Sequence, residues 1–282
     1  MPRSKTPRLG LLQTVETVME GYADRPALGQ RAVEFGADPR SGRTSLRLLP
    51  RFETITYRQL WESAGAVALA LSHDRLQPGD RVAVLGFTSA DYTTIDLALM
   101  RLRAVAVPLQ TGVPAAQLQH VVAETQPAVL ASSIECLPDA VELVLAGPPP
   151  KRLIVFDYHP QDDDQRDAFH TAAAKLIEAD SAVVIETLAG VLNRGRVSPP
   201  APVRGAGRTD SADPLALLIY TSGSTGTPKG SSVRSHLLAV VVPTDDAVAR
   251  AGGDAASMKS VLAESLRSVA GEAGLQSYEV PA

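Results

Sequence analysis

Cysteine is nearly absent from this chain of 282 residues, because Cys136 is the single one. A lone cysteine excludes an internal disulfide framework and a zinc site built on cysteines, and we interpret it as a small buried hydrophobe. Aromatic residues make up only 4% of the chain, and no apolar run approaches the roughly 18 residues that a membrane-spanning helix needs. We therefore predict a protein of a reducing compartment, the cytoplasm, with no membrane span.

A surplus of one charge sign is also lacking. The 27 basic and 31 acidic residues are mixed along the chain and leave a formal net charge of −4. Without a basic patch, electrostatic capture of nucleic acid is not expected. Lysine is scarce as well, which leaves few candidates for any role that needs an amine: Lys5, Lys151, Lys175, Lys229 and Lys259.

No metal centre is expected. The acidic run at residues 162–164 precedes a predicted helix, where negative charge complements the helix dipole, and we interpret it as surface charge. The histidines are dispersed, and no two of them have the spacing of metal ligands on one helix: His73, His120, His159, His170 and His236.

What the chain does have is a regular alternation of helical and strand patterns. A helix is predicted from Thr56, where apolar residues recur at helical spacing and Thr56 forms a capping-box pattern with Gln59. Short apolar runs further along are typical of strands buried on both faces. In chain order we expect a strand at 81–86, a helix at 90–101, a strand at 104–109, a helix at 114–124, a strand at 128–131, a helix at 139–145, a strand at 153–156, a helix at 163–179 and a strand at 183–185.

Alternation of this kind predicts an α/β fold, in which a parallel sheet is covered by helices on both faces. Residues 193–213 are rich in Arg, Gly, Pro and Ser, and we expect them to form an irregular connection. Beyond them, an apolar run starting at Pro214 predicts one more strand.

That last apolar run ends in a loop of glycines, hydroxyls and one lysine: Tyr-Thr-Ser-Gly-Ser-Thr-Gly-Thr-Pro-Lys-Gly at 220–230. Small glycines let backbone N–H groups approach phosphate oxygens, the hydroxyls add donors, and the lysine supplies a point charge. The combination predicts a site for the phosphates of a nucleoside triphosphate. The residues assigned to it are Thr221, Ser222, Gly223, Ser224, Thr225, Gly226, Thr227 and Lys229.

Two widespread phosphate-binding patterns do not fit this loop. The P-loop pattern needs glycine where Pro228 stands and a hydroxyl residue where Gly230 stands. The dinucleotide fingerprint also fails, because Gly223 and Gly226 are separated only by Ser224 and Thr225.

Residue for residue, the run 220–230 resembles the phosphate-binding loop of the acyl-adenylate-forming (AMP-binding) superfamily. That superfamily includes acyl-CoA ligases, luciferases and nonribosomal adenylation domains. Further stretches are similar to the N-terminal adenylation region of bacterial carboxylic acid reductases and of related fatty-acyl-AMP/CoA ligases. They lie at 22–29, 78–110, 155–160 and 273–280.

The resemblance implies ATP-dependent activation of a carboxylic (fatty) acid to acyl-AMP. Its implied partners are ATP, with Mg²⁺ as the expected metal, and a carboxylic acid. Members of the superfamily also carry a glutamate that helps to bind magnesium, an aspartate for the ribose and a late lysine, and none of the three is found here. Lys259, which alone follows Lys229, is interpreted as a surface lysine.

Residues 234–244 resemble the C-terminal subdomain of the superfamily, although they follow the phosphate loop almost directly. We therefore expect a large internal deletion near 231–233 and a truncated C-terminus. The expected domains are residues 1–230, the N-terminal part of an adenylation domain, and residues 231–282, a fragment resembling the C-terminal subdomain.

Two classes of function stay open. The chain is either an acid-activating ligase, or a non-catalytic remnant or partner-binding module that retains only the phosphate loop. No complete catalytic set is found, so the isolated chain is expected to be inactive. Each uncovered core side chain forfeits about 1.5–3 kcal/mol of a total stability of about 5–15 kcal/mol. We therefore expect marginal stability, with self-association or a protein partner covering the exposed apolar surface.

Overall fold

The computed structural model describes residues 11–199, 215–222 and 228–234. The chain separates into two compact units, Met1–His236 and Leu237–Ala282, and all of the described residues belong to the first. Most of the expected C-terminal fragment, including Lys259, therefore lies outside the described residues.

Within the described residues, a seven-stranded sheet has the order β7-β6-β5-β3-β4-β8-β9. Neighbouring strands from β7 to β8 run parallel, and β9 pairs antiparallel with β8. The predicted parallel sheet is thus confirmed, with an antiparallel strand added at one edge. The strands are β3 (Arg81–Leu85), β4 (Val105–Leu109), β5 (Val129–Ser133), β6 (Arg152–Phe156), β7 (Val184–Thr187), β8 (Leu215–Ser222) and β9 (Pro228–Arg234).

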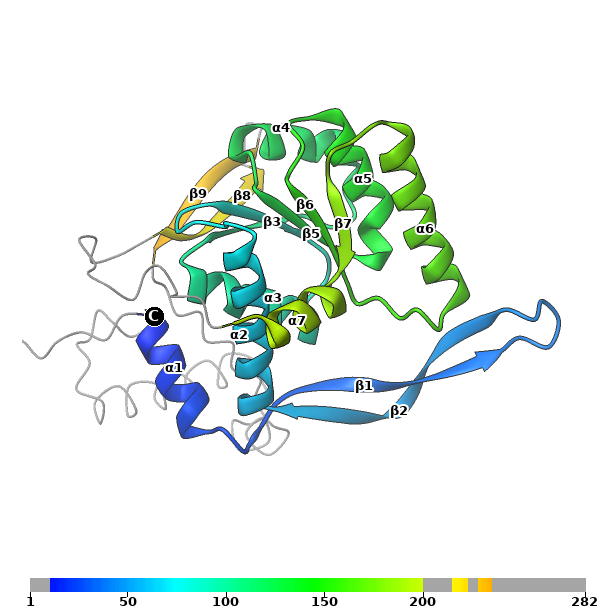
Figure 1. Ribbon diagram of the computed structural model, residues 1–282, viewed down its shortest axis with the longest axis horizontal. Coiled ribbons are helices and arrows are strands. Elements are labelled where there is room, and N and C mark those ends of the chain that lie inside the picture. The colour runs from blue at the N-terminus through cyan, green and yellow to red at the C-terminus, as the bar shows by residue number, and fades with distance from the viewer. Residues whose placement is uncertain (1–10, 200–214, 223–227, 235–282) are drawn as a thin grey trace, which may run out of the picture. The chain divides into compact units, whose positions relative to one another are not determined.

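Helices cover both faces of this sheet (Figure 1). Successive side chains of a strand point to opposite faces, so Val84 joins the core beneath α2, α3 and α7, whereas Leu85 joins the core beneath α4, α5 and α6. Helices on both faces were predicted, and this arrangement confirms them. The helices are α1 (Leu11–Gly21), α2 (Tyr57–His73), α3 (Ala90–Leu102), α4 (Ala115–Thr125), α5 (Leu137–Ala146), α6 (Asp163–Glu178) and α7 (Leu188–Val197), with a 3-10 turn η1 (Ile134–Cys136).

The start of α2 shows the predicted capping box. The Thr56 hydroxyl accepts the Gln59 backbone N–H at 3.2 Å, and the Gln59 side-chain oxygen Oε1 accepts the Thr56 backbone N–H at 2.8 Å. Two of the unpaired amides at the helix start are satisfied in this way. In the same part of the structure, none of the described helices is both long and apolar enough to cross a bilayer.

A two-stranded antiparallel hairpin precedes this α/β body, and the sequence patterns did not reveal it. It is formed by β1 (Pro26–Ala37) and β2 (Thr44–Thr56), the long ribbon at the lower right of Figure 1. Its far end is fixed to the start of α6, where Asp163 accepts the Thr44 N–H at 2.7 Å and Asp162 accepts the Leu46 N–H at 2.8 Å.

The acidic run at 162–164 therefore does more than face solvent. Asp162 caps α6 by accepting the Gln165 N–H at 2.9 Å, as expected for negative charge at a helix start. Arg43 of the hairpin pairs with Asp164 at 2.7 Å. Exposed ion pairs of this kind contribute little, so the backbone N–H bonds to carboxylates carry most of the attachment.

The irregular connection predicted for 193–213 is wrong in its first part, because α7 extends to Val197. The Thr187 hydroxyl caps this helix by accepting the Gly190 N–H at 3.1 Å, and Val191 is fully buried. Arg194 pairs with Asp74 at 2.9 Å. Burial and capping outweigh a composition that resembles a loop. The domain boundary expected at residue 230 is crossed by β9, and the division into two domains remains a proposal.

Gly195 provides a test of how closely α7 packs on α2. A Cβ placed at Gly195 would overlap the backbone carbonyl of Ala66, whereas the nearest atom to one placed at Gly190 would be the Thr187 hydroxyl oxygen at 3.4 Å. Gly195→Ala should lower the free energy of unfolding by about 1–3 kcal/mol through overpacking, although alanine in a helix normally gains about 0.5–1 kcal/mol over glycine. Urea denaturation measures the difference, with Gly190→Ala as the control. Equal stability of the two variants would contradict the close packing.

Candidate functional site

The predicted phosphate motif begins at the carboxyl end of β8. β8 runs parallel to β4, with Leu217 opposite Ala106, so its carboxyl end lies at the same edge of the sheet as those of β3 to β7. In α/β sheets, ligands bind at this edge. The fold therefore brings Thr221 and Ser222, the first two residues of the predicted set, to the edge where a ligand is expected.

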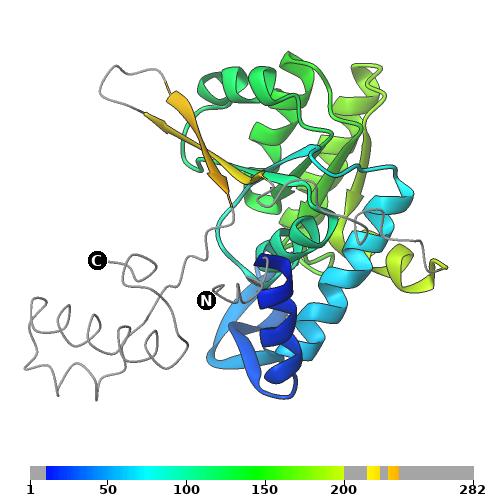
Figure 2. The same ribbon diagram turned by 90° about the vertical axis from the view of Figure 1, so that its left-hand side faces the viewer.

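β8 and β9 bring the two ends of the motif together (Figure 2). In the antiparallel pairing, Thr221 lies opposite Lys229 and Ser222 lies opposite Pro228. The backbone positions of Thr221, Ser222 and Lys229 are thus adjacent, as a shared phosphate site requires. The other predicted members lie outside the described residues: Gly223, Ser224, Thr225, Gly226 and Thr227.

Tyr220, directly before the motif, packs against α4. Its ring meets the His120 ring edge-on, with the ring centres 6.5 Å apart and the planes at 78°. Burial raises the pKa of the Tyr220 phenol, and the Glu124 carboxylate raises it further by its charge and by accepting a hydrogen bond. No role had been assigned to these residues. The spacing of His120 and Glu124 on one helical face was visible in the sequence, but their contact with β8 depends on the order of the strands.

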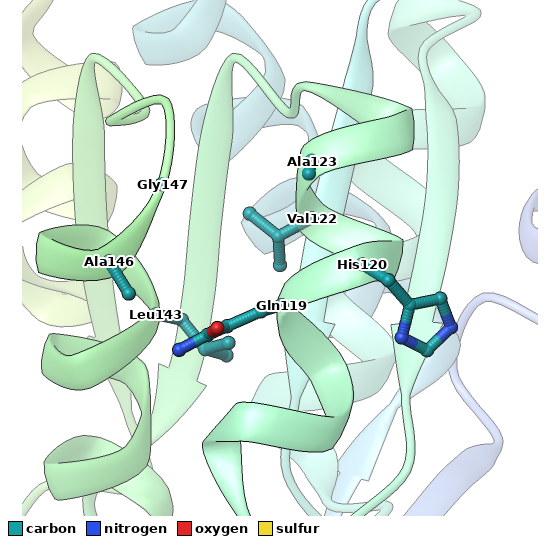
Figure 3. Close-up of a pocket in the computed structure, with 7 residues that line it drawn as sticks. All are labelled: Gln119, His120, Val122, Ala123, Leu143, Ala146 and Gly147. Carbon is teal, nitrogen blue, oxygen red and sulfur yellow. The ribbon is translucent and has the colours of Figure 1, made fainter.

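A hollow of about 280 Å³ lies between α4 and α5. Figure 3 shows Gln119, Val122 and Leu143 beside it, while the His120 ring is directed away from α5. Among the described residues, the lining includes no lysine or arginine that could bind phosphate. We therefore do not assign the nucleotide to this hollow.

A further group of polar residues lies near the carboxyl ends of β3 and β5. The helices that follow these two neighbouring strands, α3 and α5, cover opposite faces of the sheet. Asp157, which follows β6, donates its N–H to the Asp91 carboxylate at 2.9 Å. Burial raises the pKa of Asp157 to about 6, opposed by a hydrogen bond with Ser89 and assisted by repulsion from Asp91 and Glu135. Across the described residues, no group of three or more His, Cys, Asp or Glu is arranged to hold a metal ion.

The same region is closely packed. A Cβ at Gly86 would lie only 2.6 Å from the Phe156 ring, so the aromatic side chain fills the space that a glycine leaves open there. Phe156 itself is fully buried and meets the Tyr92 ring edge-on. These groups therefore stabilise the carboxyl edge of the sheet at β3 and β6.

Comparison with known proteins identifies the family. The AMP-binding enzyme family matches residues 18–244, a span that includes the whole motif. The chain belongs to the AMP-binding enzyme family. Its curated relatives include a carboxylic acid reductase of Mycobacterium tuberculosis, 58% identical over 230 residues, which cover 81% of this chain and 19% of that protein. A second carboxylic acid reductase, from Segniliparus rugosus, is 47% identical over 227 residues, which cover 79% of this chain and 19% of that protein. The chain spans about a fifth of the length of these reductases.

Solved structures agree with this assignment to the AMP-binding family. The adenylation domain of the carboxylate reductase from Mycobacterium chelonae superimposes with a TM-score of 0.76 at 45% identity, covering 82% of this chain and 35% of that one. The A domain of the Segniliparus rugosus reductase, in complex with AMP and a co-purified carboxylic acid, superimposes with a TM-score of 0.76 at 44% identity. The match covers 82% of this chain and 36% of that one. The predicted similarity to the adenylation region of carboxylic acid reductases is confirmed.

The raised pKa of Asp157 predicts how stability of this AMP-binding chain depends on pH. The folded-state pKa of about 6 exceeds the unfolded value of about 3.9, so the native state holds this proton more tightly. The contribution of Asp157 to the free energy of unfolding is therefore greatest below about pH 4, falls by about 2–3 kcal/mol as the pH rises to about 6, and then levels off. Asp157→Asn should remove this fall and stabilise the protein at pH 7 but not at pH 3.5.

Chemical denaturation at several pH values tests this prediction. Asp180→Asn is the matched control, because Asp180 is exposed and has the same left-handed backbone, with φ of 50° against 53° for Asp157. A gain from Asp157→Asn that is the same at pH 3.5 and at pH 7 would rule out the ionisation of Asp157 as its cause.

Proposed function

We propose that this chain supplies the triphosphate-binding segment of an acyl-adenylate-forming enzyme. In the proposed reaction a carboxylate oxygen attacks the α-phosphorus of ATP, and the bond from that phosphorus to pyrophosphate breaks, giving acyl-AMP. The observation that carries the proposal is the family match over residues 18–244, together with the position of the motif at the carboxyl edge of the sheet.

The donor set fits the phosphates of ATP. The hydroxyls of Thr221, Ser222, Ser224, Thr225 and Thr227 and the amides next to Gly223 and Gly226 would bind phosphate oxygens, and Lys229 would neutralise charge. The pairing of Thr221 with Lys229 supports a common target for the two ends of the motif. Mg²⁺ would enter with ATP, since the glutamate that binds it in the family has no counterpart in this sequence.

The second substrate is proposed to be a carboxylic acid, with fatty acids as the narrower class. Support comes from the Segniliparus rugosus domain, which was solved in complex with AMP and a co-purified carboxylic acid.

We also propose a cytoplasmic location and a division of the chain into two domains between residues 230 and 231. Buried, unpaired Cys136 is consistent with a reducing compartment.

Self-association or a protein partner is part of the proposal too. Side chains of several large apolar residues face solvent: Phe52 is 69% exposed, Leu48 is 57% exposed and Ile219 on β8 is 36% exposed. Exposed apolar groups of this kind favour contact with another surface.

Lys229→Ala tests the phosphate site directly. A charge-assisted contact is worth about 1.5–3 kcal/mol, so the variant should bind MgATP about 10-fold more weakly or worse. Isothermal titration calorimetry measures the affinity. Lys175→Ala, which removes an exposed lysine on α6, is the control and should bind like the wild type. Unchanged affinity in Lys229→Ala would refute the assigned role.

Exchange of labelled pyrophosphate into ATP separates the two classes of function. Exchange that depends on an added carboxylic acid would establish acid activation by this chain. Binding of MgATP without exchange would instead support a non-catalytic nucleotide-binding module.

A further inference from the structure

Tyr220 is the last described side chain before the phosphate motif. It belongs to the face of the sheet that α4 covers, where it packs with Leu218 against the core formed by α4, α5 and α6. β8 pairs with β4 on one side and with β9 on the other. The carboxyl end of β8 is thus held by backbone pairing with β9 and by Tyr220 against the helix layer.

His120 is the partner of Tyr220 on α4. The edge-on contact of the two rings, with centres 6.5 Å apart, is a favourable aromatic geometry. The Nε2 atom of His120 is buried without a hydrogen-bond partner among the described residues. Burial of an unsatisfied nitrogen costs free energy, so the hydrogen-bonding capacity of His120 does not explain its position. The ring contact with Tyr220 does.

Glu124 lies one helical turn beyond His120, and its side chain is at the exposed surface of α4. Its carboxylate adds to the burial that raises the pKa of the Tyr220 phenol. The contact that fixes the tyrosine is the ring contact with His120.

We propose that His120 is a positioning residue for nucleotide binding, which fixes Tyr220 and so orients the carboxyl end of β8 from which the phosphate motif continues. This inference rests on the proposed function. A phosphate contact is sensitive to displacements well below 1 Å, because hydrogen bonds weaken steeply with distance and angle. In this proposal His120 acts through Tyr220.

The test uses the full 282-residue chain, with MgATP as the probe. His120→Ala removes the ring contact, and His120→Phe restores an aromatic ring at the same place. His120→Ala should weaken MgATP binding by about 3- to 10-fold, and His120→Phe should recover most of it. Glu124→Gln leaves the ring contact intact and should weaken binding by about 2-fold at most. The controls are His170→Ala and Glu142→Gln, two exposed residues on α6 and α5.

Hydrogen–deuterium exchange of peptides covering 221–230 supplies a readout that does not depend on nucleotide. His120→Ala should speed exchange in these peptides and leave β3 and β5 unchanged, and His120→Phe should restore slow exchange. Faster exchange throughout the sheet, with no rescue by His120→Phe, would show that His120 has only a structural role and would overturn the proposal.

The two proposals can fail separately. If the wild type does not bind MgATP but His120→Ala selectively speeds exchange at 221–230, nucleotide binding is refuted and the positioning of the strand end stands. If the wild type binds MgATP and His120→Ala changes neither affinity nor exchange, the positioning role is refuted and the phosphate site stands.

Discussion

Burial of one parallel sheet from two sides is the constraint on which this structure depends. Strands such as β3 present Val84 to one helix layer and Leu85 to the other, and both side chains are almost fully buried. Each such side chain contributes about 1.5–3 kcal/mol, so neither layer can be lost without a large cost in stability. The same arrangement aligns the carboxyl ends of the strands along a single edge, and this alignment gives the phosphate motif its place.

The chemistry of the site follows from β8 and β9. Their pairing brings Thr221 and Lys229 together, although seven residues separate them in the sequence. Hydroxyls, glycine amides and one ammonium group are a suitable set for a triphosphate. Tyr220 joins this strand end to α4 through His120, so the helix layer that buries the sheet also orients the site. Because the chain belongs to the AMP-binding family, we propose that this site functions in the activation of a carboxylic acid.

Much of this fold could be predicted because its signals are local. The capping box of Thr56 and Gln59 and the short apolar strands follow from residues close together in the chain. The β1–β2 hairpin was missed because its support comes from Asp162 and Asp163, more than a hundred residues away. The end of α7 was wrongly predicted from composition. Glycine is common in loops, but Gly195 lies in a helix where it allows close packing against the Ala66 backbone of α2. The phosphate motif was recognisable from its residue types, whereas the role of His120 required the strand order.

A crystal structure of the chain with a non-hydrolysable ATP analogue tests the central claim most directly. The account predicts that the triphosphate oxygens lie within hydrogen-bond distance of backbone N–H groups in 221–228 and of the Lys229 ammonium. It also predicts that the nucleotide approaches the sheet from the carboxyl edge of β8. An analogue bound elsewhere on the protein, with the motif making no contact to phosphate, would contradict the account.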